Sequence, residues 1–254
     1  MARRNRHEEP QVVSPRSPWP IKLLKFVVGL LLLPVSFAVS KTVFDLLRSL
    51  NIDAVGRLSM STWWFIGGFV LWVILFFVLP RPMRTYVLAH ELSHALWAWL
   101  CGVKVSGIKV SKDGGHVRMN RTNFLILLAP YFFPFYTILV ILLYLILSAF
   151  WDMKTYEPFW MGLLGLTWAF HITFTISSLQ VIQTDITSNG YLFSYTLIYI
   201  LNLLGFALWL VAITDPTYRD LGRMLKADSL MVYSWCWEQG AAMFQYLKNI
   251  APPS

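Results

Sequence analysis

The sequence predicts an all-α polytopic membrane protein, a bundle of about five to six transmembrane helices with a membrane-associated β-hairpin. Apolar residues make up 57% of the 254 residues and charged residues only 13%, which is about half the charged fraction of an ordinary soluble domain. The mean hydropathy is +0.57, so the chain has too little polar surface to cover a soluble core. The same composition excludes a disordered chain, and two cysteines exclude a disulfide scaffold or a cysteine-rich zinc module.

Three regions follow along the chain. Residues 1–25 are basic and rich in proline, and they predict a cytoplasmic tail. Residues 26–214 are predicted to form the transmembrane domain, which opens with a retained span over the apolar run 26–40. Residues 215–254 are mixed in charge and predict an interfacial or soluble C-terminal tail. The net charge of +8 comes from residues that flank apolar segments, which indicates membrane topology rather than nucleic-acid binding.

Long windows with at most one charge predict the further spans. They are residues 58–80, 122–151, 158–184 and 186–214. Each exceeds the roughly 20 apolar residues that cross a bilayer core of about 30 Å, so we expect four more spans. Pro130 and Pro134 lie within one window and predict a kinked or broken helix, whose freed carbonyl groups neighbouring helices must satisfy.

Residues 90–94 read HELSH, an H-E-x-x-H motif within a helix that we predict over 84–101. The i, i+4 spacing places the imidazoles of His90 and His94 on one face, where they can share one Zn²⁺ per chain. Glu91 can then take a proton from the zinc-bound water as the catalytic residue. Two histidines and a glutamate in an apolar helix are costly to bury without partners, which favours a metal site over simple hydrogen bonds between helices.

The third metal ligand must come from elsewhere in the chain. Asp185 is the only charged residue between Glu157 and Asp215, and an isolated carboxylate at the end of an apolar span is by default functional. The alternative is that Asp185 caps the helix that follows it. His171 is the alternative ligand; it precedes Asp185 by about 21 Å along an ideal helix, so both cannot readily bind one ion.

Residues 103–120 alternate apolar and polar side chains around Asp113-Gly114-Gly115 and predict a β-hairpin. Its His116 is better suited to contact substrate or the metal-bound water than to bind the metal. One strand of the hairpin could accept an unwound substrate segment at its edge. An equally good interpretation is that the hairpin is a structural plug or lid.

Metal ligands must share one membrane depth, and this requirement tests the topology. If 63–80 and 84–101 both crossed the membrane, His90 and Asp185 would lie at opposite faces. If the chain instead breaks at residues 80–82 and 84–101 folds back into the inner leaflet, both lie on the cytoplasmic side. The basic hairpin then follows the positive-inside rule. We therefore expect five crossings, a re-entrant element and a cytoplasmic N-terminus.

The segment HELSHALWAWLCGVKVSGIKV, followed by DGGHV, resembles the site-2 protease group of intramembrane zinc metalloproteases, peptidase family M50. The similarity covers residues 80–190 and is greatest to the compact bacterial M50B-like branch. In that family the motif helix precedes a membrane-embedded hairpin and a later aspartate. The resemblance implies that His90, His94 and Asp185 are zinc ligands, with Glu91 as the general base.

The chain departs from the family pattern around the third ligand. That region of the family usually reads N-x-x-P-x-x-x-L-D-G, whereas this chain reads SSLQVIQTDIT, without the proline and without the following glycine. The asparagine that helps to bind the oxyanion in the family has no clear counterpart here. Gln180 or Gln183 could take its place.

The resemblance implies an intramembrane metallopeptidase of the bacterial cytoplasmic membrane, active in regulated intramembrane proteolysis. Its partners would be the lipid bilayer and a membrane-protein substrate cut in or next to a transmembrane segment, with no nucleic acid. Two alternatives stay open. One is another membrane zinc hydrolase, such as the type that cleaves prenylated proteins, with Glu157 or Glu238 as third ligand. The other is a non-proteolytic zinc-binding scaffold or chaperone on the same fold.

Overall fold

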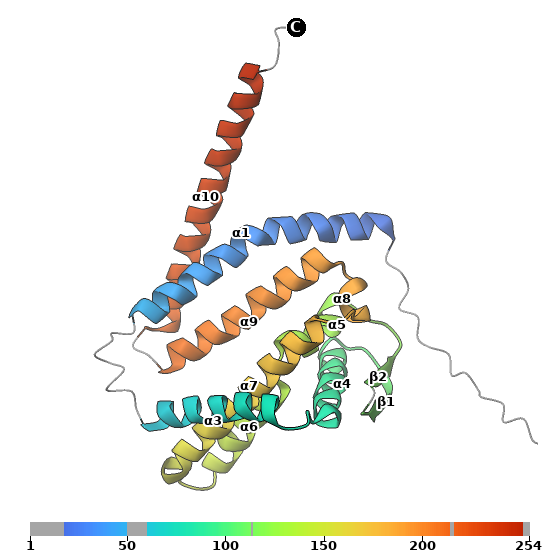
Figure 1. The fold of residues 1–254 in the computed structure, drawn as a ribbon, viewed down its shortest axis with the longest axis vertical. Coiled ribbons are helices and arrows are strands. Elements are labelled where there is room, and N and C mark those ends of the chain that lie inside the picture. Colours follow the sequence, from blue (N-terminus) through green and yellow to red (C-terminus); the bar gives the residue numbers. More distant parts are fainter. Residues whose placement is uncertain (1–17, 50–59, 113, 214–215, 251–254) are drawn as a thin grey trace, which may run out of the picture.

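The computed structural model describes residues 18–49, 60–112, 114–213 and 216–250. Most of these residues are helical, and two strands form an antiparallel hairpin. The elements in chain order (Figure 1) are α1 (Trp19–Ser49), α3 (Met60–Val78), α4 (Met83–Leu100), β1 (Val105–Ser111), β2 (Gly114–Met119), α5 (Phe124–Phe132), α6 (Phe135–Ser148), the 3₁₀ turn η1 (Lys154–Tyr156), α7 (Glu157–Leu179), α8 (Thr184–Thr187), α9 (Tyr191–Ile213) and α10 (Tyr218–Ile250).

Among the described residues, helices α1, α3, α7 and α9 each contain a segment long and apolar enough to cross a membrane. The pair α5 and α6 adds a fifth span if it is counted as one broken helix. The predicted fold class is therefore confirmed: this is an all-α polytopic membrane protein with a small hairpin. Helix α4 is not among the spans because arginine, histidine and glutamate interrupt its apolar sequence.

Helix α1 begins earlier than predicted. The sequence predicted a tail to residue 25 and a span from residue 26, but the helix starts at Trp19. Pro20 fits there because the first turn of a helix needs no N–H from proline. Lys25 does not prevent the helix either, since its ammonium group donates to Asn189 Oδ1 at 2.6 Å. Residues 1–17 of the predicted tail lie outside the described residues.

Helices α3 and α7 pack along each other with glycine at their closest approach. A Cβ atom at Gly68 would lie 1.9 Å from the carbonyl oxygen of Gly162, and one at Gly165 would lie 2.0 Å from that of Phe65. Small residues allow helix backbones to come this close, which is a common way to associate helices in lipid. These two helices form one side of the bundle, while α1 and α9 run side by side on the other (Figure 1).

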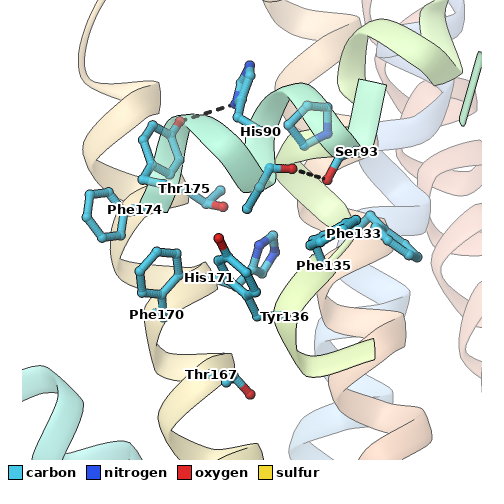
Figure 2. Close-up of a pocket in the computed structure, with 13 residues that line it drawn as sticks. His90, Ser93, Phe133, Phe135, Tyr136, Thr167, Phe170, His171, Phe174 and Thr175 are labelled. Atoms are coloured by element: carbon cyan, nitrogen blue, oxygen red, sulfur yellow. Dashed lines mark hydrogen bonds between the residues drawn. The ribbon is translucent and has the colours of Figure 1, made fainter. Parts of the chain in front are cut away.

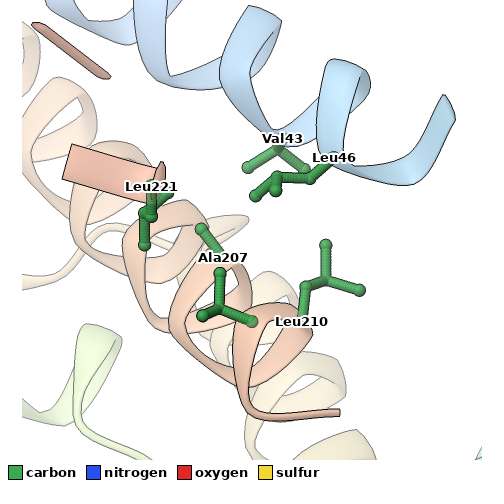
Figure 3. Close-up of a cluster of buried hydrophobic side chains, with 6 residues drawn as sticks. Val43, Leu46, Ala207, Leu210 and Leu221 are labelled. Carbon is green, nitrogen blue, oxygen red and sulfur yellow. The ribbon is translucent and has the colours of Figure 1, made fainter. Parts of the chain in front are cut away.

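Within the predicted interfacial or soluble C-terminal tail over 215–254, residues Tyr218–Ile250 form one long helix, α10. Its first half packs on α1 and α9 and completes a buried apolar cluster (Figure 3). The cluster consists of Val43, Leu46, Ala207, Leu210, Val211 and Leu221. The second half of α10 extends away from the bundle, and its side chains are exposed (Figure 1).

Mixed charge hid this packing because one of the charged side chains, Asp228, has its partners on α1. Asp228 is 5% exposed, and it accepts a hydrogen bond from Thr42 at 2.6 Å. It also forms an ion pair with Lys41 at 2.8 Å. A buried carboxylate that is paired in this way is compatible with an apolar helix interface.

The predicted break at Pro134 is confirmed. Helices α5 and α6 are bent by 76° at the break between them. Proline has no N–H to continue the helical ladder, and the bend also leaves the carbonyl group of Tyr131 without its helical donor, which the neighbouring helix α9 replaces. Asn202 Nδ2 donates to the carbonyl oxygen of Tyr131 at 2.9 Å, as the sequence predicted for a broken helix in lipid.

The hairpin follows α4 as predicted, and the two strands pair in antiparallel register from Val105 with Met119 to Ser111 with Gly114. Gly102 makes the turn between helix and strand with φ of +66°, a conformation that favours glycine. Both strands pack on α4. Helix α4, the hairpin, α8 and the first turns of α1 and α9 thus gather at one end of the bundle (Figure 1).

Candidate metal centre

Helix α4 positions two of the predicted ligands. His90 and His94 lie one turn apart on the helix face that turns toward α5 and α8, and their ring centroids are 4.8 Å apart. His94 is buried and His90 is half-buried. The local sequence explains this geometry, since residues at i and i+4 of a helix point the same way.

Asp185 from α8 completes a compact group with these histidines. Its Oδ2 lies 3.4 Å from Nε2 of His90 and 3.4 Å from Nε2 of His94. One potential ligand atom from each of the three residues lies within 4.8 Å of the others. This is the one group of metal-ligand type among the described residues.

Each of the three side chains has a second partner that fixes its orientation. His94 Nδ1 lies 2.7 Å from the carbonyl oxygen of Ile126, and His90 Nδ1 lies 3.3 Å from the hydroxyl of Tyr86 (Figure 2). The Tyr131 hydroxyl donates to Asp185 Oδ2 at 3.2 Å. Outer partners of this kind hold metal-binding side chains in place in known metal sites.

These hydrogen bonds test whether the group fits a metal ion. A carbonyl oxygen only accepts, so Nδ1 of His94 carries the proton and Nε2 of the neutral ring presents a lone pair. That lone pair faces the carboxylate oxygen of Asp185 at 3.4 Å, an arrangement that a cation bound between the two atoms would satisfy. Two nitrogen ligands and one oxygen ligand, with a fourth position left for water, suit a catalytic zinc ion.

Helix α8 holds Asp185 in place through its own neighbours. Ile186 is 1% exposed and packs in an apolar cluster with Leu128 and Tyr131. Asn189 donates to the carbonyl oxygen of Asp185 at 3.0 Å. Asp185 thus lies within a short helix, and the sequence's alternative, that it caps the next helix, is not what the structure shows.

Glu91 lies beside the group, at the wall of a cavity of about 430 Å³. Its side chain is 5% exposed, and burial raises the pKa of its carboxyl group to about 7. Strand β2 covers it closely: a Cβ atom at Gly115 would lie 2.6 Å from Cγ of Glu91. Only a glycine allows the hairpin to approach the motif helix to this distance.

The other predicted site residues divide between the cavity and its surroundings. His116 and Gln183 line the cavity with Glu91, His94 and Asp185. Gln180 is exposed at the end of α7 and does not line it, because the chain turns away between α7 and α8.

His171 lies apart from the metal group. It lines a smaller cavity of about 20 Å³ between α4, α6 and α7, which His90 lines from its other side (Figure 2). Its Nε2 lies 3.4 Å from Asn202 Oδ1. The structure therefore does not bring this alternative ligand to the other ligands.

Three residues of the site were missed from the sequence. Tyr86 precedes His90 by one helical turn, and this i, i+4 spacing could have indicated the contact. The sequence predicts Gly115 only as part of the hairpin turn and gives no sign of its contact with Glu91. Tyr131 gave no signal, because a tyrosine in an apolar helix equally suits a membrane interface.

A comparison with protein-family models bears on these residues directly. The model described as "Peptidase M50B-like" matches residues 64–214, from α3 to the end of α9. The chain belongs to the M50B-like peptidase family. The match includes the metal group, the hairpin and Glu91, and it gives this integral membrane protein a peptidase-type function. M50 peptidases in general depend on zinc, and the group of His90, His94 and Asp185 could bind a metal. No curated protein and no solved structure matches the chain.

Proposed function

We propose that this M50B-like peptidase is an intramembrane zinc metallopeptidase that hydrolyses a peptide bond in or next to a transmembrane segment of its substrate. One observation carries the proposal: Nε2 of His90, Nε2 of His94 and a carboxylate oxygen of Asp185 converge beside Glu91. They do so at a cavity of about 430 Å³, a size that admits a short peptide segment.

His90, His94 and Asp185 would hold the zinc ion. A zinc ion bound there supplies a Lewis acid for the scissile carbonyl group and lowers the pKa of water toward about 7. Glu91 is the general base, because its carboxyl group borders the same cavity as the three ligands. It takes the proton of the attacking water and delivers it to the leaving amine.

The hairpin is the element best placed to hold substrate. A transmembrane helix has its amides in internal hydrogen bonds and must unwind before it is cut, and an unwound segment can add to a strand edge. Strand β2 lines the cavity from Gly114 to Val117. It pairs with β1 alone within the described part of the chain, which leaves its outer edge for a substrate. Gln183 and His116 line the cavity as hydrogen-bond donors for the substrate carbonyl.

The distribution of basic residues supports a cytoplasmic site. Several of them lie at the end of the bundle that holds the metal group, in the first turns of α1, before and within the first turn of α4, and in the hairpin. They include Lys22, Lys25, Arg81, Arg84, Lys104, Lys112 and Arg121. Positive residues favour the cytoplasmic side, so the N-terminus and the site face the cytoplasm of a bacterial inner membrane. Cysteine labelling of sealed inverted vesicles tests this orientation. Lys112→Cys places the label at the end of the bundle that holds the metal group, and Lys154→Cys places it at the opposite end.

Cleavage of a membrane-protein substrate by the purified chain tests the activity. Glu91→Gln keeps the size of the side chain but removes the base, so we expect cleavage to fall by more than about 10²-fold while zinc stays bound. Glu157→Gln is the matched control, because Glu157 lies away from the metal group and accepts a hydrogen bond from Ser61. Zinc binding without cleavage by the wild type would instead support a scaffold.

The other membrane zinc hydrolase considered from the sequence finds no support. That alternative needs a glutamate as third ligand, and the downstream candidates are Glu157 and Glu238. Neither joins the two histidines in the described structure, where Asp185 occupies that place.

A further inference from the structure

Tyr131 connects the metal group to the interior of the bundle. Its hydroxyl donates to Asp185 Oδ2 at 3.2 Å, and its backbone carbonyl oxygen accepts from Asn202 Nδ2 at 2.9 Å. The side chain is 1% exposed and packs against Ile186, the residue next to Asp185. A shift of Tyr131 would therefore move a contact of the third ligand directly.

The carbonyl group of Tyr131 needs a partner because helix α5 ends there. In a continuous helix the N–H of Phe135 would donate to it, but the bend of 76° between α5 and α6 separates the two. Asn202, on α9, supplies the missing donor. The same amide also donates to the carbonyl oxygen of Ile198 in its own helix at 2.9 Å, so α9 holds the end of α5 at a defined position.

These two hydrogen bonds orient the Asn202 amide and so define the role of His171. Both acceptors are carbonyl oxygens, so the NH₂ group of Asn202 must face them and its Oδ1 must face the other way. His171 Nε2 lies 3.4 Å from that Oδ1, and only an Nε2–H can donate to it. His171 thus fixes the orientation in which Asn202 can hold Tyr131.

The polar residues form one continuous series across four helices. It runs from His171 on α7 to Asn202 on α9, to Tyr131 on α5, and ends at Asp185. Burying a histidine or an asparagine in an apolar span costs free energy, so such residues usually have a function or a partner. Here each has a partner, and the series leads to the metal group.

We propose that His171 and Asn202 are positioning residues of the peptidase, which hold Tyr131 so that its hydroxyl keeps Asp185 in place as a metal ligand. They act through Tyr131 and do not touch the metal. The proposal rests on the proposed zinc site. It gives His171, an isolated histidine in an apolar helix, a role other than that of a ligand.

Metal affinity in a double-mutant cycle tests this proposal. Zinc affinity of the purified full-length chain is measured by competition with a chelator for wild type, Tyr131→Phe, Asn202→Leu and the double variant. Loss of a partner of a metal ligand typically weakens metal binding by about 10–100-fold, and we expect this for Tyr131→Phe. Because Asn202 acts through Tyr131, the double variant should bind zinc less than about twofold more weakly than Tyr131→Phe alone.

The visible spectrum of the Co²⁺-substituted chain gives a second measurement that folding alone would not change. We expect Tyr131→Phe and Asn202→Leu to shift the cobalt bands in the same direction. Tyr144→Phe, on the neighbouring helix α6 beside Trp160, is the matched control and should leave them unchanged. Should Asn202→Leu fail to fold, His171→Phe replaces it in the cycle, and His171→Gln, which keeps a donor, should restore affinity.

The outcomes separate this proposal from the proposed function. A wild type that binds neither zinc nor cobalt would overturn both. Two results would overturn the positioning role and leave the zinc site intact, provided that the wild type binds zinc. One is an unchanged zinc affinity in Tyr131→Phe. The other is a double variant whose loss of affinity equals the product of the two single losses.

Discussion

At the scale of single residues, the site depends on a glycine as much as on its ligands. Gly115 lets β2 approach Glu91, the proposed general base, so closely that a methyl group has no room between them. The base is thereby held between the motif helix and the hairpin. Its position, and not only its presence, sets the rate of a reaction that needs aligned groups.

Gly115→Ala tests this contact. The added Cβ would lie 2.6 Å from Cγ of Glu91, so the glutamate or the hairpin must shift. Displacement of a catalytic group by about 1 Å can cost about 10²-fold in rate, and we expect a fall in kcat of this order with zinc still bound. Gly107→Ala in β1 is the control, because no atom lies within 4 Å of its added Cβ. Equal activity of both variants would show that Glu91 is not held in this way.

The sequence predicted those site residues whose chemistry is visible locally. The spacing of His90 and His94 shows which face they share, and Asp185 is conspicuous as a lone charge in an apolar region. Tyr131 is not visible in this way, because its importance comes from Asn202 and Asp185, which are far away in the sequence. The family resemblance added the roles of the ligands, but not this outer partner.

At the scale of elements, the pairing of α3 with α7 depends on backbone contact. A Cβ atom at Gly68 would lie 1.9 Å from the Gly162 carbonyl oxygen, whereas one at the adjacent Gly67 would have no neighbour within 4 Å. The two positions differ in packing and not in helix propensity. They therefore form a matched pair.

We expect Gly68→Ala to lower the free energy of unfolding by about 1–3 kcal/mol or more, since overpacking forces the two helices apart. Gly67→Ala should leave it unchanged or raise it slightly, because alanine is the better helix former. Unfolding in mixed detergent micelles, followed by circular dichroism, compares the two. Equal stability would contradict the close approach of α3 and α7.

Local patterns predicted some elements well and others poorly. The helix around the H-E-x-x-H motif, the hairpin and the break at Pro134 depend on residues near in sequence, and all three were confirmed. The start of α1 and the docking of α10 were not predicted. They depend on distant partners, namely Asn189 for Lys25 and the pair of Lys41 and Thr42 for Asp228.

At the scale of the whole molecule, α10 divides into a packed half and a free half. Its buried residues are Leu221, Asp228 and Val232, and none of its described residues beyond Val232 is buried. The Tyr233 hydroxyl donates a hydrogen bond to the Leu31 carbonyl oxygen at 2.8 Å. The bundle should therefore need only the first half.

Two truncated chains test this division. A chain that ends after Ser234 keeps every buried contact of α10, so we expect its yield, zinc content and cleavage rate to stay close to those of the full chain. A chain that ends after Thr217 removes the carboxylate that pairs with Lys41 and opens the cluster around Leu210. We expect it to aggregate during purification. Equal behaviour of the two chains in size-exclusion chromatography would contradict a structural role for α10.

We propose that two histidines of α4 and the aspartate of α8 hold one zinc ion. Zinc per chain in detergent-purified wild type, Asp185→Ala and Glu91→Gln tests it most directly. We expect about one zinc ion per chain in the wild type and in Glu91→Gln, and far less in Asp185→Ala, because a catalytic zinc site needs three protein ligands. Full zinc content in Asp185→Ala would show that Asp185 is not a ligand, and no zinc in the wild type would overturn the proposed zinc site.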